Sequence, residues 1–199
     1  LEIRVMEQIP AFDDPGNRAV FVAVHQSNWE LAASAIAHFG IRFVSLYSPP
    51  FNPWLDNILK TSRQALGCEL LPRDMSMRPL IRALSGQRSV AMVVDRRTDE
   101  GEPIPFFGSD KPTTLLPARL ALKYRCPLVP IRVERLRGAR FRVTFYPPIQ
   151  PGNPDAGETE QAVDMMTRVN GLFEDWIRAS PGEWFCSKRI WPKRRMGDA

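Results

Sequence analysis

The chain has few cysteines, which form the disulfides of small folds, and it has no apolar run long enough to cross a membrane. Its three cysteines, among 199 residues, are far apart and form no C-x-x-C pair, so neither a disulfide framework nor a zinc site is required. No apolar run approaches the ~20 residues of a membrane-spanning helix. The G-x-S-x-G motif of α/β-hydrolases, internal repeats and low-complexity tracts are also absent from the sequence. These absences favour a reducing compartment and a fold held together by an ordinary hydrophobic core.

The hydrophobic pattern predicts a layered α/β fold in a single domain, residues 1–199, with a largely parallel sheet flanked by helices. Apolar runs at 19–24 and 89–95 are typical of strands buried on both faces. Helices are expected from a cap at Asn28 to Gly40, and near 53–66, 76–85, 113–124 and 158–179. Further strands are expected at 1–6, 42–47, 68–71, 127–135 and 140–146, the last two as an antiparallel hairpin. The segment 96–112 is expected to be a long loop, of the kind that is functional or mobile.

An excess of basic residues favours anionic partners, since the net charge is +5 and the pI is about 9.4. Five of the cations surround a tryptophan in SKRIWPKRR, residues 187–195. Nucleic acid, anionic lipid headgroups and an acidic carrier protein all fit this pattern, and tryptophan among cations suits a membrane interface. A basic binding module without chemistry is therefore an alternative to an enzyme.

The candidate chemistry lies where two strands end, because ligands of open α/β sheets bind outside the carboxyl ends of the strands. His25 follows the strand at 19–24, and Asp95 ends the strand at 89–95. With Asn28 as the cap, Glu30 falls in the first helical turn and can reach back to the imidazole. A carboxylate there would fix the tautomer and raise the basicity of the free ring nitrogen. The alternative is a structural histidine beside a favourable first-turn charge.

Three further features have both a functional and a structural interpretation. Arg63 can grip a substrate phosphate or be a solvated helix charge. Asp95 and Arg96 can form part of a site or a local ion pair. Phe106 and Phe107 can line a groove for an acyl chain, which gains about 0.8 kcal/mol per buried methylene, or pack in the core.

The segment HQSNWE at 25–30 resembles the H-x4-[DE] motif of glycerolipid acyltransferases. It is most similar to the HxGNWE form of the bacterial lipid A late acyltransferases, the lauroyl and myristoyl transferases. Further segments follow the order of that family over nearly the whole chain: Asn52 and Arg63, Asp95 after VVD, PFFG at 105–108, Thr113, Pro117 and Ala118, CPLVPI at 126–131, and PGEWFCSKRIW at 181–191.

The resemblance implies transfer of a fatty acyl group from an acyl carrier protein thioester to a hydroxyl of a lipid A precursor, with no metal and no other cofactor. His25 would deprotonate the hydroxyl, Glu30 would orient His25, and a backbone N–H of the 25–30 turn or a basic side chain would stabilise the oxyanion. The substrate contacts that we expect are Asn28, Arg63, Asp95, Arg96, Phe106 and Phe107.

The resemblance also implies a monomer, without a nucleic-acid partner, at the cytoplasmic face of the inner membrane. We expect a membrane-anchoring segment upstream, of which this chain would be the soluble catalytic portion. Ser27 stands where the family has glycine, Arg96 where it more often has glutamine, and residues 187–189 where it has a W-x-HRR-like pattern. These departures leave another acceptor open, such as a phosphatidylinositol mannoside or an aminolipid.

Overall fold

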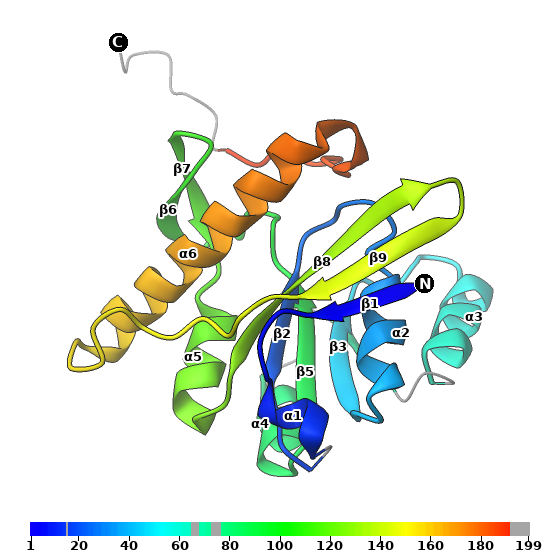
Figure 1. The fold of residues 1–199 in the computed structure, drawn as a ribbon, viewed down its shortest axis with the longest axis horizontal. Coiled ribbons are helices and arrows are strands. Elements are labelled where there is room, and N and C mark those ends of the chain that lie inside the picture. Colours follow the sequence, from blue (N-terminus) through cyan, green and yellow to red (C-terminus); the bar gives the residue numbers. More distant parts are fainter. Residues whose placement is uncertain (15, 65–67, 73–76, 192–199) are drawn as a thin grey trace.

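A computed structural model describes residues 1–14, 16–64, 68–72 and 77–191, and its centre is a seven-stranded sheet in the order β1-β9-β8-β2-β5-β3-β4 (Figure 1). All neighbouring strands are parallel except β8 and β9, which form the expected antiparallel hairpin. The strands are β1 (Glu2–Val5), β2 (Val20–Ala23), β3 (Phe43–Tyr47), β4 (Cys68–Pro72), β5 (Ser89–Val93), β8 (Leu128–Arg137) and β9 (Arg140–Phe145). The predicted fold class, an α/β fold with a largely parallel sheet flanked by helices, is confirmed.

Helices cover both faces of this sheet. One face packs against α1 (Pro10–Asp13) and α2 (Leu31–His38), and the other against α4 (Arg78–Ser85), α5 (Leu116–Tyr124) and α6 (Glu158–Ala179). Helix α3 (Pro53–Gln64) lies beside the edge strand β4 and has no buried residue. None of the helices in the described residues is both long enough and apolar enough to span a membrane.

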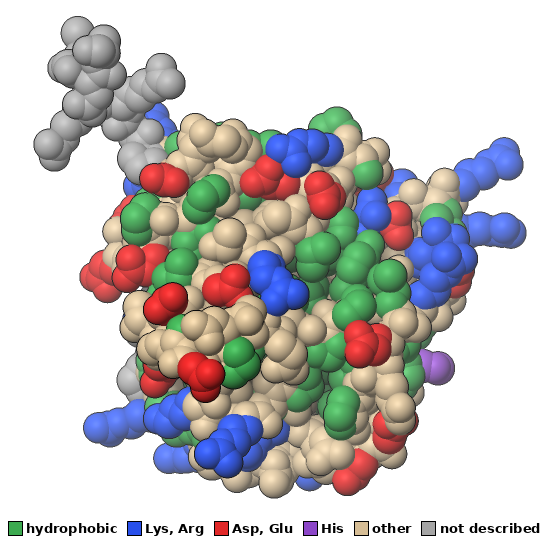
Figure 2. All heavy atoms as spheres, turned by 60° about the vertical axis from the view of Figure 1, so that its left-hand side comes forward, with side chains coloured by type: hydrophobic (Ala, Val, Ile, Leu, Met, Phe, Trp, Pro, Cys, Tyr) green, Lys and Arg blue, Asp and Glu red, His purple; other side chains and the backbone are tan. Residues whose placement is uncertain are grey.

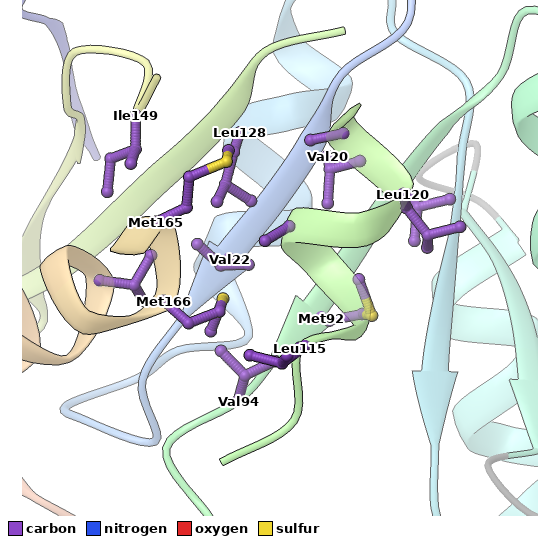
Figure 3. Close-up of a cluster of buried hydrophobic side chains, with 14 of the residues drawn as sticks. Val20, Val22, Met92, Val94, Leu115, Leu120, Leu128, Ile149, Met165 and Met166 are labelled. Atoms are coloured by element: carbon purple, nitrogen blue, oxygen red, sulfur yellow. The ribbon is translucent and has the colours of Figure 1, made fainter. Parts of the chain in front are cut away.

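The position of strand β2 in the sheet explains why its sequence is apolar throughout. Val20 and Val22 belong to the cluster that contains Met165 and Met166 of α6 (Figure 3), whereas Phe21 belongs to the cluster on the opposite face. All four residues of β2 are buried, because the strand lies inside the sheet and helices cover both of its faces. This rigid, central strand carries His25 just beyond its carboxyl end.

The prediction of a long loop over 96–112 is wrong for its second half. Strands β6 (Glu102–Phe106) and β7 (Ser109–Thr113) form a separate antiparallel hairpin there. Its two turn residues, Phe107 and Gly108, have φ angles of 53° and 73°, as in the tight turns that match the twist of a hairpin. Three prolines in the two strands hide the strand pattern in the sequence, since proline cannot donate to a strand ladder.

Some predicted helix boundaries also differ. Helix α2 begins at Leu31, because the backbone N–H of Leu31 closes a turn onto the carbonyl of Asn28 before the regular helix starts. Asn28 is therefore not the helix cap. Predicted helical residues 65, 66 and 76 lie outside the described residues.

Figure 2 shows the face of the molecule that lies to the left in Figure 1. Lys and Arg side chains stand at its margins and at isolated positions, with Asp and Glu between them. Hydrophobic side chains gather in a band to the right of its centre. On this face the positive charge is dispersed rather than drawn into one stripe.

Candidate active site

The sheet register brings His25 and Asp95 together. Strands β2 and β5 are parallel neighbours in which Ala23 lies opposite Val93, so the residues two positions further along also meet. The Nδ1 atom of His25 lies 2.5 Å from Oδ1 of Asp95. We call these two residues the His25–Asp95 pair.

Asp95 is 1% exposed, and each of its oxygens has a partner. Its second carboxylate oxygen accepts a hydrogen bond of 2.9 Å from the indole N–H of Trp184. Burial alone would raise the pKa of this carboxyl, but the hydrogen bonds from His25 and Trp184 hold the pKa below its ordinary value. An ionised Asp95 accepts the Nδ1 proton, which leaves Nε2 of His25 free to act as a base.

Glu30 has a different partner from the one that the sequence suggests. Its carboxylate forms an ion pair with Arg63 of α3, while Asp95 occupies the Nδ1 position of the imidazole. The reason is the late start of α2: Glu30 is the residue just before the helix, and its side chain is 44% exposed and faces α3. The structure thus joins Glu30 to Arg63, and His25 to Asp95.

The segment after α6 is built into the site. The N–H of Phe185 donates to the carbonyl of His25 at 2.7 Å, and the N–H of Ser27 donates to the carbonyl of Glu183 at 2.8 Å. The rings of Trp29 and Phe185 stack at 5.7 Å. The residues just before the expected basic stretch therefore close over the turn that carries His25.

Sequence reasoning did not single out Trp184, although the segment PGEWFCSKRIW contains it. Further along, Ile190 is buried and the indole N–H of Trp191 donates to the carbonyl of Phe106 at 3.1 Å. Residues 192–199, which include the second half of the basic stretch, lie outside the described residues. In the sequence only Trp191 stands among the cations, a pattern that suits a membrane interface, and nothing local to Trp184 indicates its partner.

A pocket of about 460 Å³ opens beside His25. Most of the lining residues are apolar, and three of the polar ones are arginines, a combination that suits a ligand with a hydrophobic chain and an anionic group. The apolar lining includes Phe21, Ala23, Ile36, Phe43, Leu46 and Met92, and the charged lining is Glu30, Arg63, Arg96 and Arg97. Of the predicted substrate contacts, Arg63 and Arg96 thus line the same pocket as His25.

The predicted aromatic walls lie elsewhere. Phe106 is fully buried and contacts Phe107, Trp184 and Trp191, and neither Phe106 nor Phe107 is among the described residues that line the pocket. The β6–β7 hairpin packs against α6, where the N–H of Phe107 donates to the Glu174 carboxylate at 2.8 Å and Arg178 lies over the Phe107 ring. Of the two interpretations given for these rings, the structure shows core packing.

Ser27 adopts a φ of 55°, in the left-handed region that favours glycine. The N–H groups of Gln26 and Ser27 bind the carbonyls of Val24 and Glu183. Within the described part of the chain, the next three N–H groups, of residues 28–30, donate to no protein group. They are the available backbone donors for an oxyanion near His25.

The cysteines in the described residues are poor nucleophiles. Burial raises the pKa of the Cys68 and Cys126 thiols to about 11, so both remain protonated at neutral pH. No group of three or more His, Cys, Asp or Glu side chains in the described residues has the geometry of a metal site. The base that the geometry offers is the free nitrogen of His25.

Residues 1–193 match the family described as bacterial lipid A biosynthesis acyltransferase. The phosphatidylinositol mannoside acyltransferase of Mycolicibacterium smegmatis is 25% identical over 94% of this chain and 64% of its own length. Its namesake from Mycobacterium tuberculosis is 26% identical over 88% of this chain and 55% of its own. The chain thus spans less than two thirds of these relatives. The 1-acyl-sn-glycerophosphate acyltransferase PlsC from Thermotoga maritima shares 16% identity and a TM-score of 0.42, over 87% of this chain and 72% of its own, a likeness too weak to bear on function.

Proposed function

Because the chain belongs to the bacterial lipid A biosynthesis acyltransferase family, we propose that it moves a fatty acyl group from a thioester donor to a hydroxyl of a membrane glycolipid. The observation that carries this proposal is that His25, bound to Asp95, lines a largely apolar pocket that is also lined by arginines. A base beside an apolar pocket fits an acyl chain, and guanidinium groups fit an anionic headgroup.

In the proposed reaction, Nε2 of His25 takes the proton of the acceptor hydroxyl as its oxygen attacks the thioester carbonyl. Asp95 holds the imidazole through Nδ1 and stabilises the imidazolium. We assign the stabilisation of the tetrahedral oxyanion to the N–H groups of residues 28–30, which donate to no backbone carbonyl in the described part of the chain. Collapse of this intermediate breaks the carbon–sulfur bond, and the imidazolium returns the proton to the departing thiolate. The reaction requires no further cofactor.

Arg63 is proposed to bind an anionic group of the substrate, with Arg96 beside it. Its ion pair with Glu30 fixes the guanidinium at the pocket, where its side chain is 15% exposed. In this proposal Glu30 acts by holding the Arg63 guanidinium in position, and Asp95 acts by holding the His25 imidazole in position. The two carboxylates of the predicted site would therefore serve two different groups.

An acyl carrier protein is the donor that we propose, at the cytoplasmic face of an inner membrane. The net charge of +5 supports an acidic carrier. For the acceptor there are two candidates: the family description favours a lipid A precursor, and the names of the relatives favour a phosphatidylinositol mannoside.

The test is mass spectrometry of products from parallel reactions. Purified protein receives one acyl carrier protein thioester and either a lipid A precursor without its secondary acyl chains or a phosphatidylinositol mannoside. A mass gain of one acyl chain on one acceptor, lost in folded His25→Ala, is expected and assigns that acceptor. An acyl-coenzyme A arm reveals whether the carrier protein is needed. A gain that persists in His25→Ala would contradict the mechanism, and no gain on either acceptor would contradict both proposed substrates.

The exposed side chains of helix α3 support the proposal that the protein contacts a membrane surface. Leu59 and Arg63 of this helix line the pocket, while Trp54, Leu55 and Ile58 are exposed by 68%, 47% and 46%. Exposed apolar side chains beside a lipid-binding pocket are typical of a surface that lies in the headgroup region.

We therefore expect Trp54→Ala with Ile58→Ala to weaken binding to anionic phospholipid vesicles about tenfold, because each side chain loses apolar area that the bilayer would bury. Co-sedimentation with vesicles measures the binding. Leu136→Ala is the matched control, since Leu136 is 45% exposed on the β8–β9 hairpin, away from the pocket lining. Equal loss in both variants would argue against α3 as the contact.

A further inference from the structure

A lysine lies fully buried next to the His25–Asp95 pair. Lys111 of β7 is 0% exposed, and its Nζ donates to the backbone carbonyl of Asp95 at 3.2 Å and to Oδ1 of Asn170 at 3.0 Å. The same ammonium group lies 4.1 Å from the centre of the Phe106 ring. These three contacts satisfy the three N–H groups of the ammonium.

A closed hydrogen-bond network fixes this arrangement. Asn170 of α6 is buried, and its amide nitrogen donates to the carbonyl of Pro105 at 3.3 Å and to Oγ1 of Thr113 at 3.4 Å. Its oxygen must therefore point to Lys111. None of the contacts of Nζ is with a carboxylate oxygen, so the positive charge has no direct ion-pair partner among the described residues.

Most of the other charges in this region are paired. Asp95 and Glu174 are the carboxylates whose charges act on Lys111, and Glu174 binds Arg178 at 2.6 Å. On the pocket side of His25, Glu30 is paired with Arg63. Asp95 then has Lys111, His25 and the adjacent Arg96 as possible countercharges, and no ion pair joins Asp95 to Arg96 in the described part of the chain. The charged groups that face Lys111 or His25 from the surrounding elements are Asp95, Glu174, Arg178, Glu30, Arg63, Arg96 and Arg97.

We propose that Lys111 is a positioning residue whose buried positive charge balances Asp95 and so keeps His25 unprotonated and able to act as a base. A buried carboxylate requires a countercharge nearby. With Lys111 in place, its positive charge balances the negative charge of Asp95 while His25 is neutral. Without Lys111, protonation of His25 would supply the positive charge beside Asp95. A protonated His25 cannot act as a base. The role of His25 as a base rests on the proposed function, whereas the charge balance does not.

The buried lysine also costs stability. Burial lowers the pKa of Lys111 to about 8, although the charges of Asp95 and Glu174 act in the opposite direction. An unfolded chain would hold this proton up to the ordinary value of 10.5, so the contribution of Lys111 to stability rises as the pH goes from about 8 to 10.5. At neutral pH the charged form is therefore unfavourable to folding. Groups that cost stability are commonly retained where function needs them.

An NMR titration of the imidazole resonances tests the proposal without a substrate. The chain has two histidines, so His38 on the surface is an internal reference. We expect Lys111→Met to move the titration midpoint of His25 toward higher pH by about 1, because a nearby positive charge that opposes protonation is gone. Lys111→Gln, which can keep hydrogen bonds but not the charge, should act in the same direction. Lys123→Met, which removes an exposed lysine of α5, should change neither histidine.

An unchanged His25 midpoint in a folded Met or Gln variant would overturn the proposal, whatever the outcome for acyl transfer. The wild-type chain provides a test that needs no variant: loss of the Lys111 proton near pH 8 should appear as a second step in the His25 resonances. Absence of that step would also count against the proposal. In an acyl-transfer assay, the acidic limb of kcat/KM should move with the midpoint, whereas a purely structural effect would lower the rate equally at every pH.

Discussion

Asp95→Asn is expected to lower kcat about a thousandfold, within the range of general-base contributions, and Glu30→Gln about tenfold or less. The carboxylate of Asp95 accepts two hydrogen bonds, from His25 and from Trp184. An amide has only one oxygen and can accept in one of these directions. When its NH₂ faces Nδ1, the imidazole must carry its proton on Nε2, which removes the base. Glu30 contacts Arg63, so its loss should appear mainly in KM.

Steady-state rates of acyl transfer for both variants measure the difference. Thermal unfolding followed by circular dichroism serves as the control, because asparagine has almost the shape of aspartate and should leave the fold intact. A fall in kcat for Glu30→Gln as deep as that for Asp95→Asn would contradict the assignment of Asp95 as the partner of His25.

Trp184→Phe should lower kcat about tenfold, since a hydrogen bond to a charged group contributes about 1.5–3 kcal/mol. The indole N–H donates to Oδ2 of Asp95, the carboxylate oxygen that does not bind His25, and so sets the direction of the carboxylate toward His25. Trp191→Phe is the matched control: it also loses an indole hydrogen bond in the same segment, but to the carbonyl of Phe106. Its kcat should change little.

The two substitutions at Asp95 and Trp184 should not be additive. In Asp95→Asn, the N–H of Trp184 competes with His25 for the single amide oxygen. Removing that N–H leaves the oxygen free for Nδ1 of His25. The double variant is therefore expected to be at least as active as Asp95→Asn alone. Multiplication of the two single losses would show that Trp184 acts independently of Asp95.

Much of the fold could be predicted from the sequence because the strands are short and buried. The apolar runs that became β2 and β5 are recognisable without tertiary information, and so is the position of His25 and Asp95 at their ends. Their pairing was beyond local reasoning, because it depends on two strands 70 residues apart becoming parallel neighbours in a given register. Glu30 is close to His25 in sequence, and this local proximity was misleading.

Two other features depended on tertiary contacts. The β6–β7 hairpin has prolines and charges where a strand usually has β-branched residues, and packing against α6 compensates for that composition. The aromatic residues after α6 look like surface anchors when read alone. Only the folded chain shows that Trp184 meets Asp95 and that Ile190 is buried.

The pairing of residues 25–27 with 183–185 has a consequence for synthesis on the ribosome. His25 emerges early, together with the first strands of the sheet, whereas Trp184 emerges after every strand and helix that supports the pocket. A nascent chain therefore carries the base and its carboxylate before the indole that orients them is available. The contacts of Asp95 with His25 and Trp184 therefore cannot all form until residue 184 has been synthesised.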